Sequence, residues 1–388
     1  MKRPFSFLAT SSVPLIVAST GLIAGTYGLV RFAYGLLLPE MQAELDFTTA
    51  AAGAVSAGGS VAYCAGAILG FAVASRAARL LVLGAGLSAS IGATGMAIAS
   101  GFPLFAACAV VSSLGAGLAS PALVDVLARS VAPALQARAQ TVVNAGTGPG
   151  LVAAGALALA LLPGWRTVWV VAAATTAAAA VAVLLLDRGP RRQEHTPSVA
   201  PSRAWFSAHR GAMLAAALLG AGSAGVWNYG RTLLVDRGGS TEESVVAWIV
   251  LGAGGAAAIA TAPWISAMTP RTAWTVTTVA AGAGTAGLAV AAGTPPLALL
   301  SCLVFGWGYT AATGALIRWT SEIDAERAAT GTALLFVVLI LGQAVGAIAI
   351  GRLVDGPGPV VAFLVAAVAT TMAGARFSRS SRPRALQS

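Results

Sequence analysis

Long apolar runs separated by short polar segments repeat along the whole chain. A membrane-spanning helix needs about 20 mostly apolar residues, and twelve runs come close to or exceed this length. They lie at residues 13–38, 49–74, 80–99, 104–127, 139–162, 166–186, 211–234, 244–265, 272–292, 297–319, 330–351 and 358–376. The pattern therefore predicts an all-α integral membrane protein with twelve transmembrane helices.

One polar interruption is longer than the others and lies near the middle of the chain. Residues 187–210 contain several Arg, Pro and Ser residues and show no hydrophobic periodicity, which is typical of a linker. We therefore expect an N-terminal six-helix bundle at 1–186, a cytoplasmic linker at 187–210, a C-terminal six-helix bundle at 211–376 and a basic cytoplasmic tail at 377–388.

Three short motifs recur in the two halves at similar offsets. Tyr34-Gly35 recurs as Tyr229-Gly230, Gly115-x-Gly117 as Gly306-x-Gly308, and Gly146-x3-Gly150-x4-Gly155 as Gly342-x3-Gly346-x4-Gly351. These matches favour a duplication that gives two pseudo-symmetric bundles. Internal repeats with a binding site at their interface are typical of secondary transporters.

Composition and charge support a membrane protein and give its orientation. Only 9% of the residues are charged and 57% are hydrophobic, which excludes an ordinary soluble domain. Of the 23 Lys and Arg residues, all but Arg31, Arg166, Arg231, Arg237 and Arg352 lie on one side if the N-terminus is inside. The positive-inside rule then predicts cytoplasmic termini in a cell inner membrane.

The sequence indicates no metal, cofactor or catalytic chemistry. Cys64, Cys108 and Cys302 lie in separate apolar runs, and no CxxC occurs. His195 and His209 both lie in the predicted linker. There is no phosphate-binding glycine loop and no basic stripe with interleaved aromatics, so we expect no nucleic-acid partner and no enzyme activity. The expected partners are a small-molecule substrate, the lipid bilayer and, where transport is coupled, protons; a monomer is expected.

Two stretches carry a resemblance to a known family. GLVRFAYGLLLPEMQ at 28–42, followed by GGSVAYCAGAILG at 58–70, resembles the YbfB-like branch of the major facilitator superfamily. The twelve runs, the duplication and the basic central linker resemble the superfamily as a whole. The resemblance implies a rocker-switch carrier in which helices one, four, seven and ten line a central cavity.

The chain also departs from the superfamily pattern. Ala74 occupies the acidic position of the loop between helices two and three, and a Ser112-Ser113 region replaces the arginine often found in helix four. The helix-five motif of antiporters survives in part, at 146–150. These departures put the superfamily's locking and coupling devices in doubt for this chain.

Arg31 is the leading candidate for substrate binding. Burying a cation in hydrocarbon costs about 2.5 kcal/mol or more, so an intramembrane arginine usually faces a cavity or a partner. Tyr27, Arg31 and Tyr34 have the spacing i, i+4, i+7, which places them on one face of an α-helix. The guanidinium would bind a carboxylate, sulfonate or phosphate with two hydrogen bonds. The alternative is a structural hydrogen bond to carbonyls of a neighbouring helix.

Other polar and aromatic residues on the cavity helices complete the predicted site. They are Tyr27, Tyr34, Trp227, Asn228, Arg231, Trp307 and Tyr309, together with Asn144 in helix five and Gln343 in helix eleven. For Arg231, an interfacial position is an equal alternative. Asn144 and Gln343 could equally form interhelical hydrogen bonds.

Proton coupling requires a group that titrates near the site, and the candidates are few. Asp125 lies near the cytoplasmic end of helix four, and Glu40 lies just past the outer end of helix one; no Asp or Glu occurs mid-membrane. Asp125 could instead be a helix-end partner of Arg129. Coupling to the substrate itself and uncoupled transport stay open.

The sequence predicts a secondary transporter that moves a small organic solute, anionic or amphipathic, by alternating access. The partial helix-five motif favours export. The alternative is a proton-coupled multidrug efflux antiporter for lipophilic compounds. Such an antiporter would require an acidic side chain within the membrane. A membrane-embedded enzyme or sensor would need a catalytic constellation or a soluble domain, and the sequence shows neither.

Overall fold

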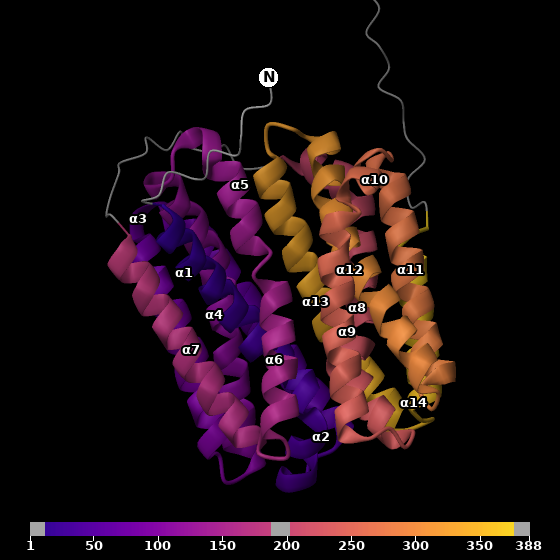
Figure 1. Cartoon of the computed structure of the whole chain (residues 1–388). Helices are drawn as coiled ribbons and strands as arrows, with labels where there is room; N and C mark the ends of the chain where they lie inside the picture. Colours follow the sequence, from indigo (N-terminus) through magenta and orange to yellow (C-terminus); the bar gives the residue numbers. More distant parts are fainter. Residues whose placement is uncertain (1–11, 188–201, 376–388) are drawn as a thin grey trace, which may run out of the picture.

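The computed structural model describes residues 12–187 and 202–375, and all regular structure in these ranges is helical. The first half contains α1 (Val13–Ile23), the π-helix η1 (Ala24–Phe32), α2 (Ala33–Leu45), α3 (Thr49–Ile98), α4 (Phe102–Ser130), α5 (Pro133–Asn144), α6 (Thr147–Leu161) and α7 (Trp165–Leu186). The second half contains α8 (Arg203–Asp236), α9 (Thr241–Ala260), α10 (Ala262–Ser266), α11 (Pro270–Ala291), α12 (Pro295–Ile323), α13 (Ala328–Asp355) and α14 (Pro359–Met372). Figure 1 shows the two halves as two bundles side by side.

The 50-residue helix α3 contains two membrane passes. At 1.5 Å per residue it would be about 75 Å long, more than twice the hydrocarbon core. Its backbone leaves the helical region at Ala77 (φ −137°, ψ 28°). Before Ala77 the contacts of its glycines advance along α4 from Val110 to Pro121, and after it they return to Cys108. The chain therefore reverses direction at Ala77.

The described helices agree with the predicted membrane fold. Nine of them are long and apolar enough to cross a bilayer, with α3 counted once. The second pass of α3 is a further span, and α8 and the 14-residue α14 bring the count close to the predicted twelve. The prediction of an all-α, multi-pass membrane protein is confirmed.

Helix one and helix seven are longer than predicted. Helix one continues to Leu45, so Glu40 lies on the helix and not beyond its end. Helix α8 begins at Arg203, because the Ser202 side chain accepts a hydrogen bond from the Trp205 amide and caps it. The predicted linker therefore overlaps the first eight residues of this helix.

The placement of His209 in a linker was wrong. Its side chain is fully buried on α8, where its ring nitrogens lie 2.9 Å from the Trp205 carbonyl oxygen and from the Thr320 hydroxyl. The polar residues around it hid the helical spacing that places Trp205 and His209 on one face. His195 and the basic tail lie outside the described residues.

Helices five and eight are each broken near a proline. The predicted helix five is divided into α5 and α6 at residues 145–146. Pro149 has no N–H for the carbonyl of Ala145, so the α-helical ladder is interrupted there. Thr261 separates α9 from α10 ahead of Pro263.

The glycine motif of helices five and eleven has the same packing role in both bundles. A Cβ at Gly146 or Gly150 would overlap the carbonyls of Thr20 and Ala24 in helix one. A Cβ at Gly342 or Gly346 would overlap the carbonyls of Ala217 and Ala221 in α8. Close backbone approach at small residues is a common means of packing membrane helices. These equivalent contacts support the duplication predicted from this motif.

The glycines of helices four and ten pack against equivalent neighbours in the two bundles. Gly115 and Gly117 of helix four pack against helices three and two, and Gly308 and Gly306 of helix ten pack against helices nine and eight. Because these contacts run in opposite order along the two helices, the predicted pairing of Gly115 with Gly306 stays a prediction.

The two bundles meet closely at the end that carries the 45–49 connection. In the described ranges, the hydrogen bonds that join the bundles run from residues 31–64 to residues 228–355. At this end a Cβ on Gly35 would overlap the Trp227 carbonyl, so glycine allows helix one to cross α8. The bundles are therefore closed below the centre of Figure 1, at the end near α2 and α14.

Candidate functional site

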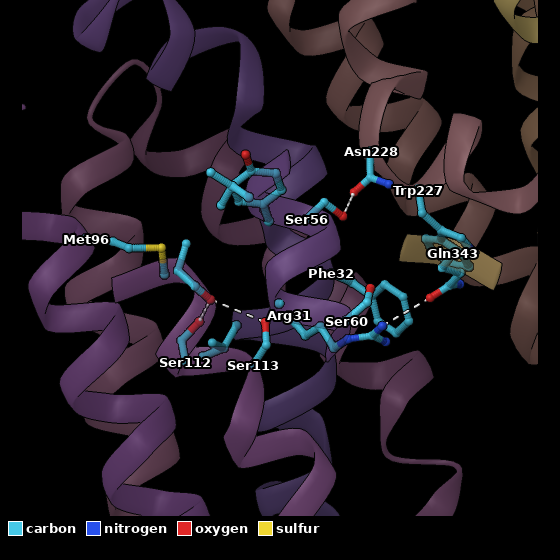
Figure 2. Close-up of a pocket in the computed structure, with 15 residues that line it drawn as sticks. Arg31, Phe32, Ser56, Ser60, Met96, Ser112, Ser113, Trp227, Asn228 and Gln343 are labelled. Carbon is cyan, nitrogen blue, oxygen red and sulfur yellow. Dashed lines mark hydrogen bonds between the residues drawn. The ribbon is translucent and has the colours of Figure 1, made fainter. Parts of the chain in front are cut away.

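A small pocket lies between the bundles and extends into the N-terminal one (Figure 2). Its volume is about 40 Å³, which is room for about three water molecules. The residues that line it are Val30, Arg31, Phe32, Tyr34, Val55, Ser56, Gly59, Ser60, Met96, Ala109, Ser112, Ser113, Trp227, Asn228 and Gln343. Five of these, Arg31, Tyr34, Trp227, Asn228 and Gln343, are predicted site residues, and Ser112 and Ser113 are the serines noted in place of the helix-four arginine.

Arg31 is half-buried at this pocket and is held by neutral groups. Its Nη2 donates to Oε1 of Gln343 at 3.0 Å, across the bundle interface. Its guanidinium carbon lies 4.8 Å from the ring centre of Tyr63 and 5.2 Å from that of Phe32, within cation–π range. Among the described residues, no carboxylate forms a salt bridge with Arg31. The cation is therefore positioned but not neutralised.

The π-helix η1 carries Arg31, which corrects the spacing argument. A π-helix uses i→i+5 hydrogen bonds, so the i, i+4, i+7 face of an α-helix does not apply to residues 24–32. Arg31 and Tyr34 line the pocket, whereas Tyr27 does not. The Tyr27 hydroxyl lies 3.0 Å from that of Tyr63 and 3.1 Å from that of Ser120.

The π-helix accommodates extra residues in helix one relative to helix seven. The equivalent contacts of the glycine motif are at Ala24 in helix one and at Ala221 in α8. The Tyr-Gly motif follows ten residues later in helix one, at Tyr34, and eight residues later in α8, at Tyr229. A π-helix takes up about one more residue per turn than an α-helix, and η1 covers about two turns. The two additional residues therefore fit in η1, at the segment that presents Arg31.

Two polar contacts link the bundles across the pocket. Gln343 accepts from Arg31 and donates to the Tyr309 hydroxyl at 3.0 Å. The Ser56 hydroxyl donates to Oδ1 of Asn228 at 2.7 Å. The predicted residues Gln343 and Tyr309 therefore form one network with Arg31, as neutral groups that orient the cation, and Asn228 forms a separate link between the bundles.

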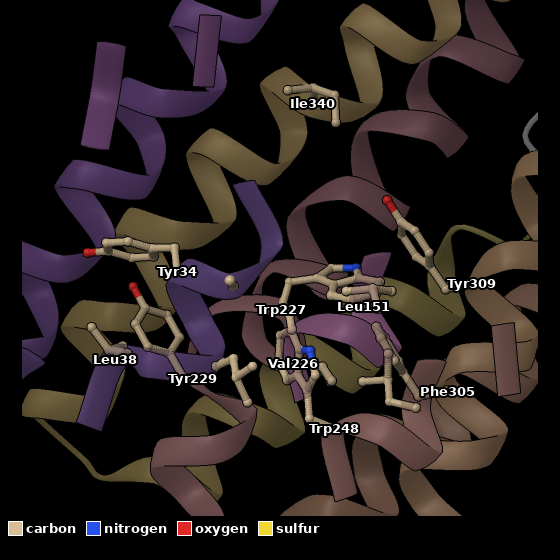
Figure 3. Packing of buried hydrophobic residues seen from close by; sticks show 14 of the residues in the cluster. Tyr34, Leu38, Leu151, Val226, Trp227, Tyr229, Trp248, Phe305, Tyr309 and Ile340 are labelled. Atoms are coloured by element: carbon tan, nitrogen blue, oxygen red, sulfur yellow. The ribbon is translucent and has the colours of Figure 1, made fainter. Parts of the chain in front are cut away.

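An aromatic cluster forms the C-terminal wall of the site (Figure 3). The ring centres of Trp227 and Phe32 are 4.5 Å apart, and those of Trp227 and Tyr309 are 5.2 Å apart. Phe305 and Trp248 pack edge-on against Trp227 on its other sides. These rings fill the space within the C-terminal bundle, so the polar part of the pocket lies in the N-terminal bundle.

Arg231 and Glu40 lie away from the pocket, in the closed end. The Arg231 side chain is 1% exposed and forms a two-pronged salt bridge with Glu40, at 2.5 and 2.6 Å. It also donates to the Leu36 carbonyl and to the Ser244 hydroxyl. The predicted roles in substrate binding and coupling are not favoured by this geometry, because each side chain is engaged by the other.

Three further predicted residues do not line the pocket. Asn144 is exposed at the end of α5, where it accepts from Gln140. The Trp307 indole donates to Thr261 at 2.8 Å, toward α9. Asp125 is half-buried on α4, and its coupling role stays a prediction.

Sequence reasoning did not assign the pocket serines to the site, nor Tyr63, which packs on Arg31. Ser56, Ser60 and Tyr63 lie on the first pass of α3, and Ser112 and Ser113 lie on α4. Hydroxyl residues in apolar runs bond easily to their own helix, so their presence was weak evidence by itself. The GGSVAY segment of helix two was the available signal.

No group of three or more His, Cys, Asp or Glu side chains suited to a metal ion occurs in the parts of the chain that the structure describes. The three cysteines are free thiols; Cys64 and Cys302 are buried and Cys108 is partly buried. The chemistry available at the pocket is therefore that of one guanidinium, several neutral oxygens and aromatic walls.

The fold resembles that of several solved transporters. The chain superposes on a mutant of the nucleoside transporter NupG with a TM-score of 0.77 and 16% identity, covering 93% of this chain and 98% of that one. A D-xylose-proton symporter gives a TM-score of 0.71 at 16% identity, with coverage of 94% and 96%. A bacterial homologue of the human lysosomal transporter Spinster, in an inward-facing and unoccupied conformation, gives 0.73 at 16% identity, with 94% of both chains covered. No curated protein matches the sequence.

A family model also matches most of the sequence. The model of the Major Facilitator Superfamily matches residues 20–339, which include parts of both bundles. The comparisons do not divide the superfamily further, so the YbfB-like branch stays a prediction. The fold, the duplication and this match agree, and the chain belongs to the Major Facilitator Superfamily, a family of transporters and not of enzymes.

Proposed function

We propose that this protein carries a small organic anion across a cell inner membrane by alternating access, with Arg31 as the anchoring cation. The observation that supports this most directly is the state of Arg31. It lines the pocket at the bundle interface, bonds to a neutral amide and has no salt-bridge partner among the described residues. An anionic ligand would complete its hydrogen bonding with charge-assisted bonds.

The lining of the pocket argues against a lipophilic cation as the substrate. No Asp or Glu occurs among the described residues that line it. A cation there would lie close to Arg31 without a compensating charge, and like charges in a partly buried site repel strongly. Glu40, the coupling candidate on helix one, is engaged by Arg231. We therefore favour the anion carrier over the multidrug antiporter.

The closed end fits one state of an alternating-access cycle. With cytoplasmic termini, as the distribution of Lys and Arg predicts, the end closed by Arg231 and Glu40 faces outward, and the protein is inward-facing. Export remains the direction that we propose, on the partial helix-five motif. Loading vesicles from each side in turn tests the direction.

The central test is the replacement Arg31→Gln in the full chain, reconstituted in vesicles. Glutamine keeps hydrogen-bonding capacity but removes the charge, so we expect at least a hundredfold loss of organic-anion transport, since bonds to a charged group contribute about 1.5–3 kcal/mol each and a bidentate pair makes two. Arg166→Gln is the matched control, because Arg166 is a part-exposed arginine that pairs with Glu44 away from the pocket.

The control variant should transport at the unmodified rate, and both variants should melt as the unmodified protein does. Undiminished anion transport by Arg31→Gln would make this arginine structural. A thermal shift caused by lipophilic cations alone, across a panel of organic anions and cations, would favour the antiporter instead.

A further inference from the structure

Four serines line the N-terminal side of the pocket, opposite Gln343. Ser56 and Ser60 come from the first pass of α3, and Ser112 and Ser113 come from α4. Figure 2 shows Ser112 and Ser113 beside each other on the far side of Arg31 from Gln343. The site proposed above therefore has two parts, a cation and a group of hydroxyls.

The protons of three of these hydroxyls are already used within the protein. Ser112 and Ser113 both donate to the Ala109 carbonyl, at 2.8 and 3.3 Å, and Ser56 donates to Asn228 at 2.7 Å. A hydroxyl has one proton and two lone pairs. What these serines offer to a ligand is therefore the acceptor side of their oxygens.

A ligand that fits must bring hydrogen-bond donors together with a negative charge. An ammonium group is a donor, but it would lie near Arg31 in a pocket whose described lining holds no carboxylate. A hydroxyl donates without charge, whereas a purely apolar ligand would leave the acceptor lone pairs of the serine oxygens unused. The small pocket volume limits this part of the ligand to a few non-hydrogen atoms.

We infer that the substrate is a small hydroxycarboxylate, with its carboxylate on Arg31 and its hydroxyl groups donating to the serines of α4. This inference rests on the proposed anion transport and narrows it to one chemical class. The serines then act as specificity residues, because they distinguish hydroxylated acids from their deoxy and amino counterparts without contributing to the binding of the carboxylate itself.

A series of three-carbon acids tests the inference on the purified full-length protein. Propionate, lactate and glycerate share a carboxylate and carry no, one and two hydroxyls; alanine replaces the lactate hydroxyl with an ammonium. Dissociation constants measured by calorimetry should fall by about fivefold for each hydroxyl, the effect of one hydrogen bond of about 1 kcal/mol. Alanine should bind more weakly than propionate.

The double replacement Ser112→Ala and Ser113→Ala should abolish the preference for glycerate over propionate. Ser113→Ala alone should remove part of the preference, and it serves if the double variant does not fold. Ser90→Ala is the matched control, since Ser90 also donates to a backbone carbonyl, that of Ala173, outside the pocket. It should bind the series as the unmodified protein does.

The outcomes separate the two proposals. If none of the three acids binds, the proposed anion transport itself fails. If all three bind equally, or if alanine binds more tightly than lactate, anion transport stands and the hydroxycarboxylate assignment is overturned. A preference for glycerate that persists in the double variant would show that the serines of α4 do not accept hydrogen bonds from the ligand hydroxyls.

Discussion

The two bundles share a glycine scaffold but contain different chemistry where they face each other. In the N-terminal bundle Gly92 packs against Cys108 and Ser112, and in the C-terminal bundle Gly284 packs against Ser301 and Phe305. In these two contacts Phe305 takes the place that Ser112 has in the other bundle. One bundle is hollow and polar at this level, and the other is filled with aromatic rings.

The two arginines of the cavity helices differ in the same way. Arg31 is half-buried, bonds to an amide and faces a pocket, whereas Arg231 is fully buried and paired with Glu40. An arginine that already has a carboxylate stabilises a closed state, and one without a carboxylate can bind an anion. On the proposed function, the N-terminal bundle selects the ligand, and the C-terminal bundle supplies an aromatic wall and the Arg231 end of the ion pair that closes the outer end.

Replacing Phe305 in the C-terminal bundle and Ser112 in the N-terminal bundle tests this comparison most strongly. Phe305→Ala should destabilise the protein by about 3–5 kcal/mol, because it opens a cavity in a fully buried aromatic cluster. The reciprocal change Ser112→Phe should fill the pocket and abolish binding of organic anions. Thermal unfolding and calorimetry measure the two effects. Retained binding in Ser112→Phe would contradict a ligand pocket in the N-terminal bundle.

Removing the charge of Glu40 tests whether its ion pair with Arg231 holds the two bundles closed at the outer end. Glu40→Gln leaves the buried guanidinium of Arg231 without its anion, and breaking a buried pair costs about 3–5 kcal/mol. We expect about 2 kcal/mol, because Glu40 is 14% exposed and glutamine can still accept one bond. The closed end should also open more often, which cysteine labelling at that end would detect.

Glu44→Gln is the matched control for this change. It removes an ion pair with Arg166 in which the two side chains are 50% and 33% exposed, and exposed pairs contribute at most about 1 kcal/mol. Equal effects of the two replacements would show that the Arg231 pair is no more than a surface contact.

An effect of similar size is expected for the shared scaffold. Gly150→Ala and Gly346→Ala each place a Cβ against a carbonyl, of Ala24 and Ala221 respectively, and each should lower stability by about 1–3 kcal/mol. Gly314→Ala is the control, since no atom lies within 4 Å of the added Cβ. A loss confined to one bundle would contradict the equivalence of the two glycine motifs.

Much of the fold was predictable because the bilayer restricts what a chain can do. Every backbone polar group in hydrocarbon needs an internal partner, so long apolar runs become helices. The errors fell where polar residues continue a helix, as at Arg203 to Arg210 and at Glu40, since hydropathy does not register a helix that extends beyond the membrane. The π-helix η1 was not predictable, because spacing arguments assume one helical period.

The sequence by itself determined the membrane class from hydropathy and indicated the duplication from its repeated glycine motifs. It also singled out Arg31 as a candidate, because placing a charge in hydrocarbon is costly. Only the tertiary structure distinguished Arg31 from Arg231. Their partners, Gln343 and Glu40, lie 312 and 191 residues away in the chain. The same holds for the serine oxygens at the pocket, because the rotation of each helix against its neighbours decides which side chains meet.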